Sequence, residues 1–146
     1  MTRYFVEIAY NGTRLSGWQR QLNAPSVQAK IEDACRVILR EPTFEILGCG
    51  RTDAGVHATK YIAHFDFEGV FPKSFLQRAN KVVGNDIYIK QLYEVPQTAH
   101  ARFDAVSRSY EYHLSYNKNP FAQETEWCFP KISPLDTSLM QKRLNY

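Results

Sequence analysis

The residues best suited to chemistry lie in one short segment, Gly-Arg-Thr-Asp-Ala-Gly-Val-His-Ala at positions 50–58. Gly50 and Gly55 permit positive φ angles and close backbone approach, so the loop can be tight and hold its side chains in a fixed direction. Asp53 lies between these glycines, two residues after Arg51, and a nearby arginine favours the charged form of a carboxylate. This combination suits a nucleophilic or general-base aspartate.

The same residue types also have ordinary structural roles. Asp53 can accept hydrogen bonds from nearby backbone amides, as in an Asx turn, and spacing alone favours that role. Similarly, His57 is more often a hydrogen-bonded loop residue than a catalyst. Nothing beside this segment suggests a catalytic triad or a cluster of metal ligands. Three scattered cysteines (Cys35, Cys49 and Cys128) fit neither a disulfide framework nor a zinc site.

The elements that must position this loop follow from hydrophobic periodicity. Apolar residues alternate over 3–10 and 61–67 and recur at helical spacing in two other segments, with Ser26 as a helix N-cap and Cys35 on an apolar helix face. The order β-α-β-β-α-β predicts an α+β, ferredoxin-like fold (a split βαβ unit, as in RNA-recognition modules), with an antiparallel sheet and helices on one face. The predicted elements are strand 3–10, a helix from Pro25-Ser26 to Glu41-Pro42, strands 43–47 and 61–67, a helix from Pro72 to Gly84 with Val82 inward, and strand 87–95.

The last third of the chain carries a weaker pattern. Period-two alternation predicts a fifth strand over 107–116, an irregular stretch over 117–134, and a helix over 135–146 with Asp136 near its start. That helix has no stop signal. Either the chain ends there, or it is cut within a longer element.

Composition is that of an ordinary globular domain, 44% hydrophobic and 23% charged. A net charge of +3 and a pI of about 8.8 are milder than the roughly pI 9 and above of dedicated nucleic-acid binders. No apolar run approaches the ~18 residues of a membrane span, and a signal core is absent from the N-terminal sequence. We therefore expect a cytoplasmic protein with no membrane association.

The segment from Gly50 to His57 resembles the signature around the active-site aspartate of tRNA pseudouridine synthases of the TruA type. Two further blocks resemble the family, in the family's order and at similar spacing. Together the three blocks span nearly the whole chain. The first comprises Tyr10-Asn11-Gly12 and Gly17-Trp18-Gln19-Arg20-Gln21, and the third His100-Ala101-Arg102-Phe103 and Arg108-Ser109-Tyr110.

The resemblance implies an activity and a partial fold. Family members isomerise uridine to pseudouridine in the anticodon arm of tRNA, at positions 38 to 40, without cofactor or metal, and act as homodimers. The chain would be the N-terminal half of that catalytic fold. Residues 1–116 would form the ferredoxin-like subdomain with the aspartate loop. Residues 117–146 would be a connecting segment and the start of a helix leading to a missing C-terminal half.

It also implies roles for individual residues. Asp53 corresponds to the catalytic carboxylate, Tyr110 to the tyrosine that packs on the target base, and Arg51 to the residue that assists base flipping. A salt bridge from Arg51 to Asp53 is the alternative. For Trp18, core packing is favoured over stacking on RNA. The remaining candidates for substrate or phosphate contact are Arg14, Arg20, His57, Arg102 and Arg108.

Two other function classes fit parts of this sequence. A non-catalytic RNA-binding module could use the same sheet and tyrosines, but Asp53 would repel phosphate and weaken its binding. The other class is a hydrolase with a carboxylate nucleophile. This sequence contains no second catalytic carboxylate, metal cluster or phosphate-binding glycine loop to support it. The intact loop around Asp53 therefore favours the synthase.

Overall fold

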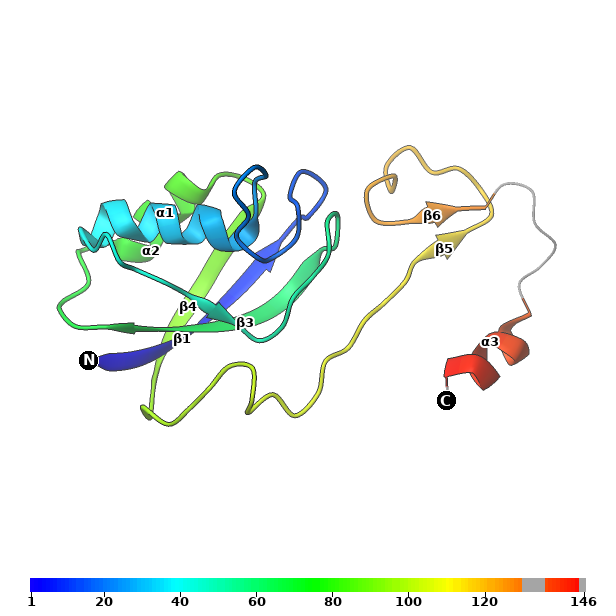
Figure 1. Ribbon diagram of the computed structural model, residues 1–146. Coiled ribbons are helices and arrows are strands. Elements are labelled where there is room, and N and C mark those ends of the chain that lie inside the picture. Colours follow the sequence, from blue (N-terminus) through cyan, green and yellow to red (C-terminus); the bar gives the residue numbers. More distant parts are fainter. Residues whose placement is uncertain (130–135, 145–146) are drawn as a thin grey trace. The chain divides into compact units, whose positions relative to one another are not determined.

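The computed structural model describes residues 1–129 and 136–144. Contacts divide the chain into two compact units, residues 1–108 and residues 109–146. Most of the secondary structure belongs to the first unit (Figure 1). That unit contains β1 (Thr2–Tyr10), α1 (Val27–Leu39), β2 (Leu47–Gly48), β3 (Ala58–Phe67), α2 (Phe75–Val83) and β4 (Ile87–Val95).

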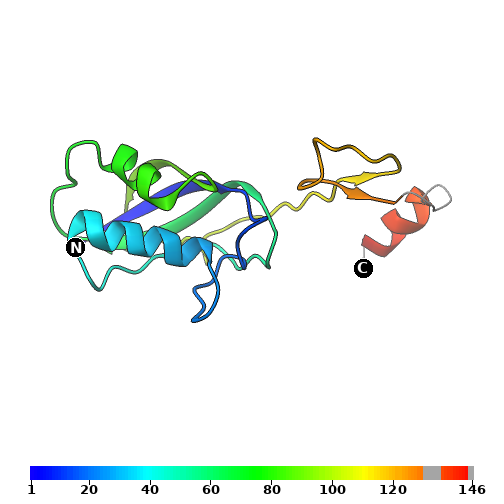
Figure 2. The same ribbon diagram turned by 90° about the horizontal axis from the view of Figure 1, so that it is seen from above.

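The four strands of the first unit form one sheet in the order β2-β3-β1-β4. Every neighbouring pair is antiparallel. Helices α1 and α2 lie side by side over one face of this sheet (Figures 1 and 2). The predicted α+β, ferredoxin-like class is confirmed, because chain order, strand order and the single helical layer all agree with it.

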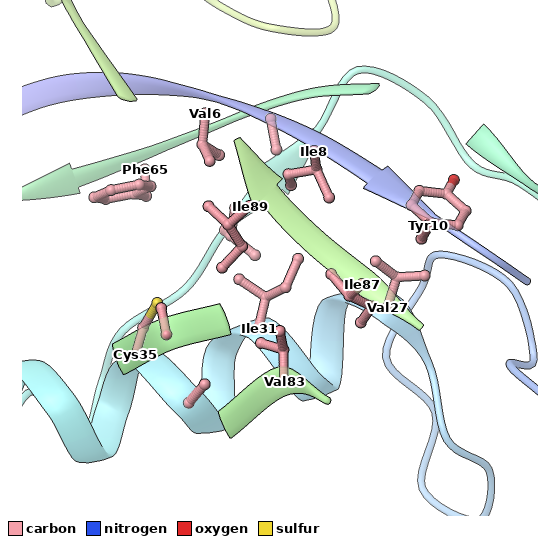
Figure 3. Packing of buried hydrophobic residues seen from close by; sticks show 14 of the residues in the cluster. Val6, Ile8, Tyr10, Val27, Ile31, Cys35, Phe65, Val83, Ile87 and Ile89 are labelled. Atoms are coloured by element: carbon pink, nitrogen blue, oxygen red, sulfur yellow. The ribbon is translucent and has the colours of Figure 1, made fainter. Parts of the chain in front are cut away.

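The hydrophobic core fills the space between the sheet and the two helices. Figure 3 shows Val6 and Ile8 of β1 and Ile89 of β4 facing Ile31 of α1 and Val83 of α2. Each of these side chains is at most 2% exposed. The alternation read over 3–10 and 61–67 is therefore confirmed, because the residues predicted to face inward in β3 (Tyr61, Ala63, Phe65 and Phe67) are also buried.

Helix α1 begins as predicted. The Ser26 side chain accepts a hydrogen bond from the Ala29 backbone N–H, which satisfies one of the free donors at the helix start. Cys35 is 3% exposed and lies in the core, as expected from its position on the apolar face of the helix. The helix ends at Leu39, where Arg40 adopts a left-handed conformation with φ 56° before Pro42 is reached.

The predicted strand over 43–47 is wrong, since β2 comprises only Leu47–Gly48. Phe44 and Ile46 are buried, and this burial produced the strand-like pattern. Side chains of α1 bind the backbone here in place of a neighbouring strand. Glu32 Oε1 accepts from the Ile46 N–H at 3.2 Å, and Arg36 Nε donates to the Phe44 carbonyl at 3.1 Å.

Helix α2 starts later than predicted. Pro72 accepts a turn hydrogen bond from the Phe75 N–H, and Ser74 has φ 59°, so helical geometry begins only at Phe75. Val82 was expected to point inward and is instead 57% exposed. Gly84, with φ 84°, terminates the helix as expected.

The fifth strand predicted over 107–116 is also wrong in extent. In the second unit only β5 (Leu114–Ser115) is a strand, and it pairs in parallel with β6 (Trp127–Cys128), within the stretch expected to be irregular. Residues 107–113 are exposed. Alternation indicates which side chains share a face, but a strand also requires a partner for its backbone groups.

Helix α3 (Thr137–Leu144) covers the described part of the helix predicted over 135–146. The Asp136 side chain accepts from the Leu139 N–H at 2.9 Å and so caps its start. Leu135 and residues 145–146 lie outside the described residues. Among the described helices, none is long and apolar enough to cross a membrane.

Candidate functional site

The loop that carries Asp53 connects β2 to β3 and is fastened to the loop that follows β1. The Trp18 N–H donates to the Thr52 carbonyl at 3.0 Å, and the Gly55 N–H donates to the Leu15 carbonyl at 3.2 Å. On the other side, the Tyr10 hydroxyl and Thr52 Oγ1 share a hydrogen bond of 2.9 Å. The first and second sequence blocks thus form one structural unit around the aspartate.

Two glycines make this close contact possible. A Cβ on Gly12 would lie 2.1 Å from the Val56 carbonyl oxygen, and one on Gly17 would lie 2.2 Å from the Thr52 carbonyl oxygen. Gly17 also has φ +83°, which L side chains rarely adopt. Both glycines belong to the first block, but their contact with the aspartate loop could not be predicted from the residue pattern.

An aromatic pair packs against the loop that carries Asp53. The rings of Trp18 and Tyr61 are stacked with centroids 4.3 Å apart, and the Tyr61 hydroxyl donates to the Gly50 carbonyl. Trp18 is 2% exposed, so its predicted core position is confirmed. Burial raises the pKa of the Tyr61 phenol, which keeps its proton on the oxygen as a donor.

Asp53 itself is exposed at the surface of this rigid loop. Its backbone carbonyl accepts from the Val56 N–H, which closes a turn. Within the described residues its carboxylate makes neither an Asx-type hydrogen bond nor an ion pair with Arg51. The Asx turn and the Arg51 salt bridge are therefore both absent there, and the Asp53 side chain is exposed.

The third block reaches the aspartate loop through Arg108. Its guanidinium donates to the Cys49 carbonyl through Nε at 3.0 Å and through a terminal nitrogen at 2.6 Å. The same terminal nitrogen donates to the Arg102 carbonyl at 2.9 Å. Arg108 thus links the segment around Arg102 to the chain just before Gly50.

A cavity of about 320 Å³ lies beside the loop and is bordered by all three blocks. Its charged rim includes Arg51 and Arg102, both exposed, and the Arg102 guanidinium carbon lies 5.9 Å from the Phe103 ring centre. Cationic groups beside an exposed aromatic ring suit a phosphate and a flat base. The full lining is Trp18, Gln19, Gln28, Ile46, Leu47, Gly48, Gly50, Arg51, His100, Arg102 and Phe103.

Other predicted site residues have structural partners. Arg20 Nε donates to Glu32 at 2.7 Å, and a terminal nitrogen of Arg20 donates to Asp33 at 2.6 Å. Because Glu32 is 2% exposed, this pair anchors the first block to α1. Likewise, Arg14 pairs with the Asp86 carboxylate at 2.5 Å. The sequence offered no sign that Glu32 would be buried.

His57 and Tyr110 were also predicted at the site. His57 Nδ1 accepts from the Gly12 N–H at 3.1 Å, so the ring helps to join the two loops. Tyr110 belongs to the second unit, and its side chain is 63% exposed. In the described part of the chain, no group of three or more acidic, histidine or cysteine side chains could hold a metal ion.

Similar proteins carry consistent names. The chain is 48% identical over 126 residues to tRNA pseudouridine synthase A of Porphyromonas gingivalis, a match covering 84% of this chain and 50% of that protein. It is 44% identical over 146 residues to that of Azobacteroides pseudotrichonymphae (99% and 57%) and 42% over 146 residues to that of Rippkaea orientalis (98% and 49%). No family model matches. The chain spans about half the length of these curated relatives.

Proposed function

We propose that this chain, which belongs to the tRNA pseudouridine synthase A family, is the part of an enzyme that presents the catalytic aspartate for converting uridine to pseudouridine in tRNA. The main support is the position of Asp53. Asp53 is exposed, yet the backbone on either side of it, at Thr52 and Gly55, is fixed by hydrogen bonds to the loop that follows β1. Such preorganisation is what a catalytic group requires.

The reaction needs a nucleophile or base rather than a redox group. The N1–C1′ glycosidic bond breaks, the uracil turns, and a C5–C1′ bond forms, while C5 loses a proton and N1 gains one. Asp53 is the group proposed to start this sequence, by attacking the ring, attacking C1′ or removing a sugar proton. Each of these roles uses an ionised carboxylate with free access to the nucleoside.

The target uridine must leave its stack before Asp53 can reach it, which costs a few kcal/mol. Arg51, two residues from Asp53 and on the rim of the cavity, is proposed to help hold the base outside the helix. Tyr110 is proposed to stack on that base, an interaction typically worth roughly 1–3 kcal/mol. Arg102 is proposed to contact phosphate, which fixes register without reading sequence.

The arginines with protein partners are proposed to act differently. Arg108 already donates to two carbonyls, so its main role would be to hold the aspartate loop, with any remaining donor free to meet RNA. Arg14, Arg20 and His57 stay candidates for substrate contact, secondary to the structural contacts they make.

The finer features of the activity are likewise proposals. We infer that the modified uridines lie at positions 38 to 40 in the anticodon arm, that the complete protein works as a homodimer in the cytoplasm, and that two subunits contact each tRNA. The family resemblance supports these features. We also propose that residues 1–116 form the catalytic subdomain and that residues 117–146 lead into the second half of the complete protein.

The test uses the complete protein that contains this chain, with unmodified tRNA labelled with tritium at uracil C5. Formation of the C5–C1′ bond expels the label, so release reports isomerisation directly. Transcripts with a uridine at only one of positions 38, 39 or 40 assign the site. Release with these substrates supports the proposal. Binding of tRNA without release would instead indicate a non-catalytic RNA-binding module.

A further inference from the structure

We propose that His64 is a positioning residue and that its ability to hold the neighbouring segment depends on its protonation state. As a neutral imidazole it holds residues 99–104 against β3, and this places Arg102 and Phe103 at the cavity beside the Asp53 loop. The contacts that hold this segment are observed in the structure and do not depend on the proposed function. Their consequence for tRNA rests on the proposed function.

His64 lies on the face of the sheet opposite the helices and is 2% exposed. Its Nδ1 accepts a hydrogen bond from the Ala101 backbone N–H at 3.3 Å. Ala101 is itself 4% exposed, so this amide cannot turn to water while the contact is closed. An Nδ1 that accepts must be unprotonated, and the proton of the neutral ring is then on Nε2.

Charged and titratable groups near this ring lie on β1 (Arg3), on β3 itself (Asp66) and in residues 99–104 (His100), while β2 contributes the apolar Leu47 as sheet partner. Burial lowers the pKa of His64, and the adjacent His100 and Arg3 lower it further, whereas Asp66 opposes them. Phe5 of β1 adds an apolar ring, with its centre 6.1 Å from that of His64. The site therefore favours the neutral imidazole that the hydrogen bond requires.

Further contacts hold the same segment, residues 99–104. We call the set of contacts made by His64, Arg3 and His100 the clasp. Arg3 donates to the Ala99 carbonyl at 2.9 Å while forming two hydrogen bonds of 2.8 Å to the Asp66 carboxylate. The His100 ring lies 4.5 Å from that of His64, and its Nδ1 accepts from the Arg102 and Phe103 amides at 3.2 and 3.3 Å. The segment is thus held at successive backbone groups.

The clasp connects directly to the aspartate loop. The Arg102 carbonyl accepts from Arg108, and Arg108 also donates to the Cys49 carbonyl. His100, Arg102 and Phe103 all line the cavity beside Gly50. Release of the Ala101 amide would therefore move one wall of the cavity and loosen the Arg108 bridge to the loop.

Protonation of His64 would turn Nδ1 into a donor facing the Ala101 N–H. The contact would then open as the pH falls through the lowered pKa of His64. Since the folded pKa lies below the ordinary value of about 6.5, the stabilisation is complete above that value and is lost in more acidic solution.

The experiment is amide hydrogen exchange by NMR on this chain from about pH 4 to pH 7.5, across the histidine range, with rates corrected for intrinsic exchange. The probe is the Ala101 amide, and the Ile8 amide in β1 reports global unfolding. His64→Asn keeps an acceptor near Nδ1 but cannot titrate. His64→Leu removes the acceptor. His100→Asn tests whether the neighbouring histidine is the titrating group.

We expect protection at Ala101 to fall by up to about tenfold per pH unit from the ordinary histidine pKa of about 6.5 down to the lowered pKa of His64, while Ile8 stays more strongly protected and so shows that Ala101 exchanges by local opening. His64→Asn should retain protection and lose this dependence, His64→Leu should lose protection throughout, and His100→Asn should keep the dependence. A flat profile in the parent chain, a dependence that survives His64→Asn, or one lost only in His100→Asn would overturn the proposal. Because no activity is measured, failure of tritium release would refute the proposed function without affecting this result.

Discussion

The backbone N–H of Trp18 donates to the Thr52 carbonyl at 3.0 Å, one residue before Asp53. This contact joins two segments that are far apart in sequence. Trp18 is held in place by its stacking on Tyr61 from β3, so the position of the aspartate follows from the core of the sheet. The chemistry of the loop and the packing of the fold are therefore coupled at this point.

We expect Gly17→Ala to displace the aspartate loop. Its Cβ would lie 2.2 Å from the Thr52 carbonyl oxygen, at a residue with φ +83°. The left-handed conformation alone costs an alanine about 1–2 kcal/mol. The clash adds to that cost, so we predict that the free energy of unfolding, measured in urea, falls by more than the conformational cost alone. We also predict that the complete protein loses tritium release.

Gly84→Ala is the matched control. Its φ is +84°, but nothing lies within 4 Å of the new Cβ, and the residue ends α2 away from the loop. With ψ −172° it lies in a region that is essentially restricted to glycine, so the substitution should cost about 1–3 kcal/mol and leave the activity unchanged. Equal effects of the two substitutions on stability and activity would contradict the close packing described for Gly17.

Arg102 and Arg20 should respond differently to truncation. Arg102→Ala removes an exposed cation on the cavity rim, so we expect weaker tRNA binding and a salt dependence reduced by about 0.7–0.9 in the slope of log K against log [salt]. Arg20→Ala should mainly lower stability, because it leaves the buried Glu32 carboxylate with fewer donors.

Filter binding at several salt concentrations and urea unfolding separate these effects. If Arg20→Ala reduces the salt slope at unchanged stability, Arg20 contacts phosphate and its pair with Glu32 is secondary. If Arg102→Ala leaves both tRNA affinity and slope unchanged, the cavity rim is not part of the tRNA-binding surface.

The Arg3–Asp66 pair should make stability depend on acid. Hydrogen bonding from Arg3 is the main cause that holds the pKa of the Asp66 carboxyl below its usual range. The stabilisation is complete above the unfolded pKa of about 3.9 and is lost as the pH falls through the lowered folded pKa. Urea unfolding between about pH 2 and pH 6 checks this, and Asp66→Asn should flatten that part of the profile. An unchanged profile in that variant would refute the assignment.

Cys35 should be inert in the folded protein. Burial raises the pKa of its thiol to about 12, so at pH 8 only about one molecule in 10⁴ carries the reactive thiolate. In a chain with Cys49→Ser and Cys128→Ser, a disulfide reagent should modify Cys35 only after denaturant is added. Rapid modification without denaturant would mean that α1 opens readily.

Sequence patterns predicted the long strands β1, β3 and β4 and helix α1 well because each buries one regular face. Val6 and Ile8 lie in the core as their alternation indicates, and Ser26 caps α1 as its type indicates. The patterns failed where burial had another cause. Phe44 and Ile46 point into the core from a segment fastened by side chains of α1, which imitates a strand in the sequence.

The candidate site was predictable in composition but not in its contacts. The type and setting of Asp53, together with the family resemblance, marked it as the candidate carboxylate. The contacts that fix its loop could not be predicted, because they join residues distant in sequence, as Gly12 with Val56 and Arg108 with Cys49. Nor could alternation reveal that His64, within an ordinary strand, accepts from Ala101.

We propose that Asp53 is the catalytic carboxylate. The most direct test of this claim is tritium release from C5-labelled tRNA by the complete protein, by its Asp53→Asn variant and by a Glu94→Asn control at an exposed carboxylate of β4. We predict normal release by the parent and the control, and none by Asp53→Asn despite intact folding and tRNA binding. Release by Asp53→Asn at the parent's rate would contradict the claim.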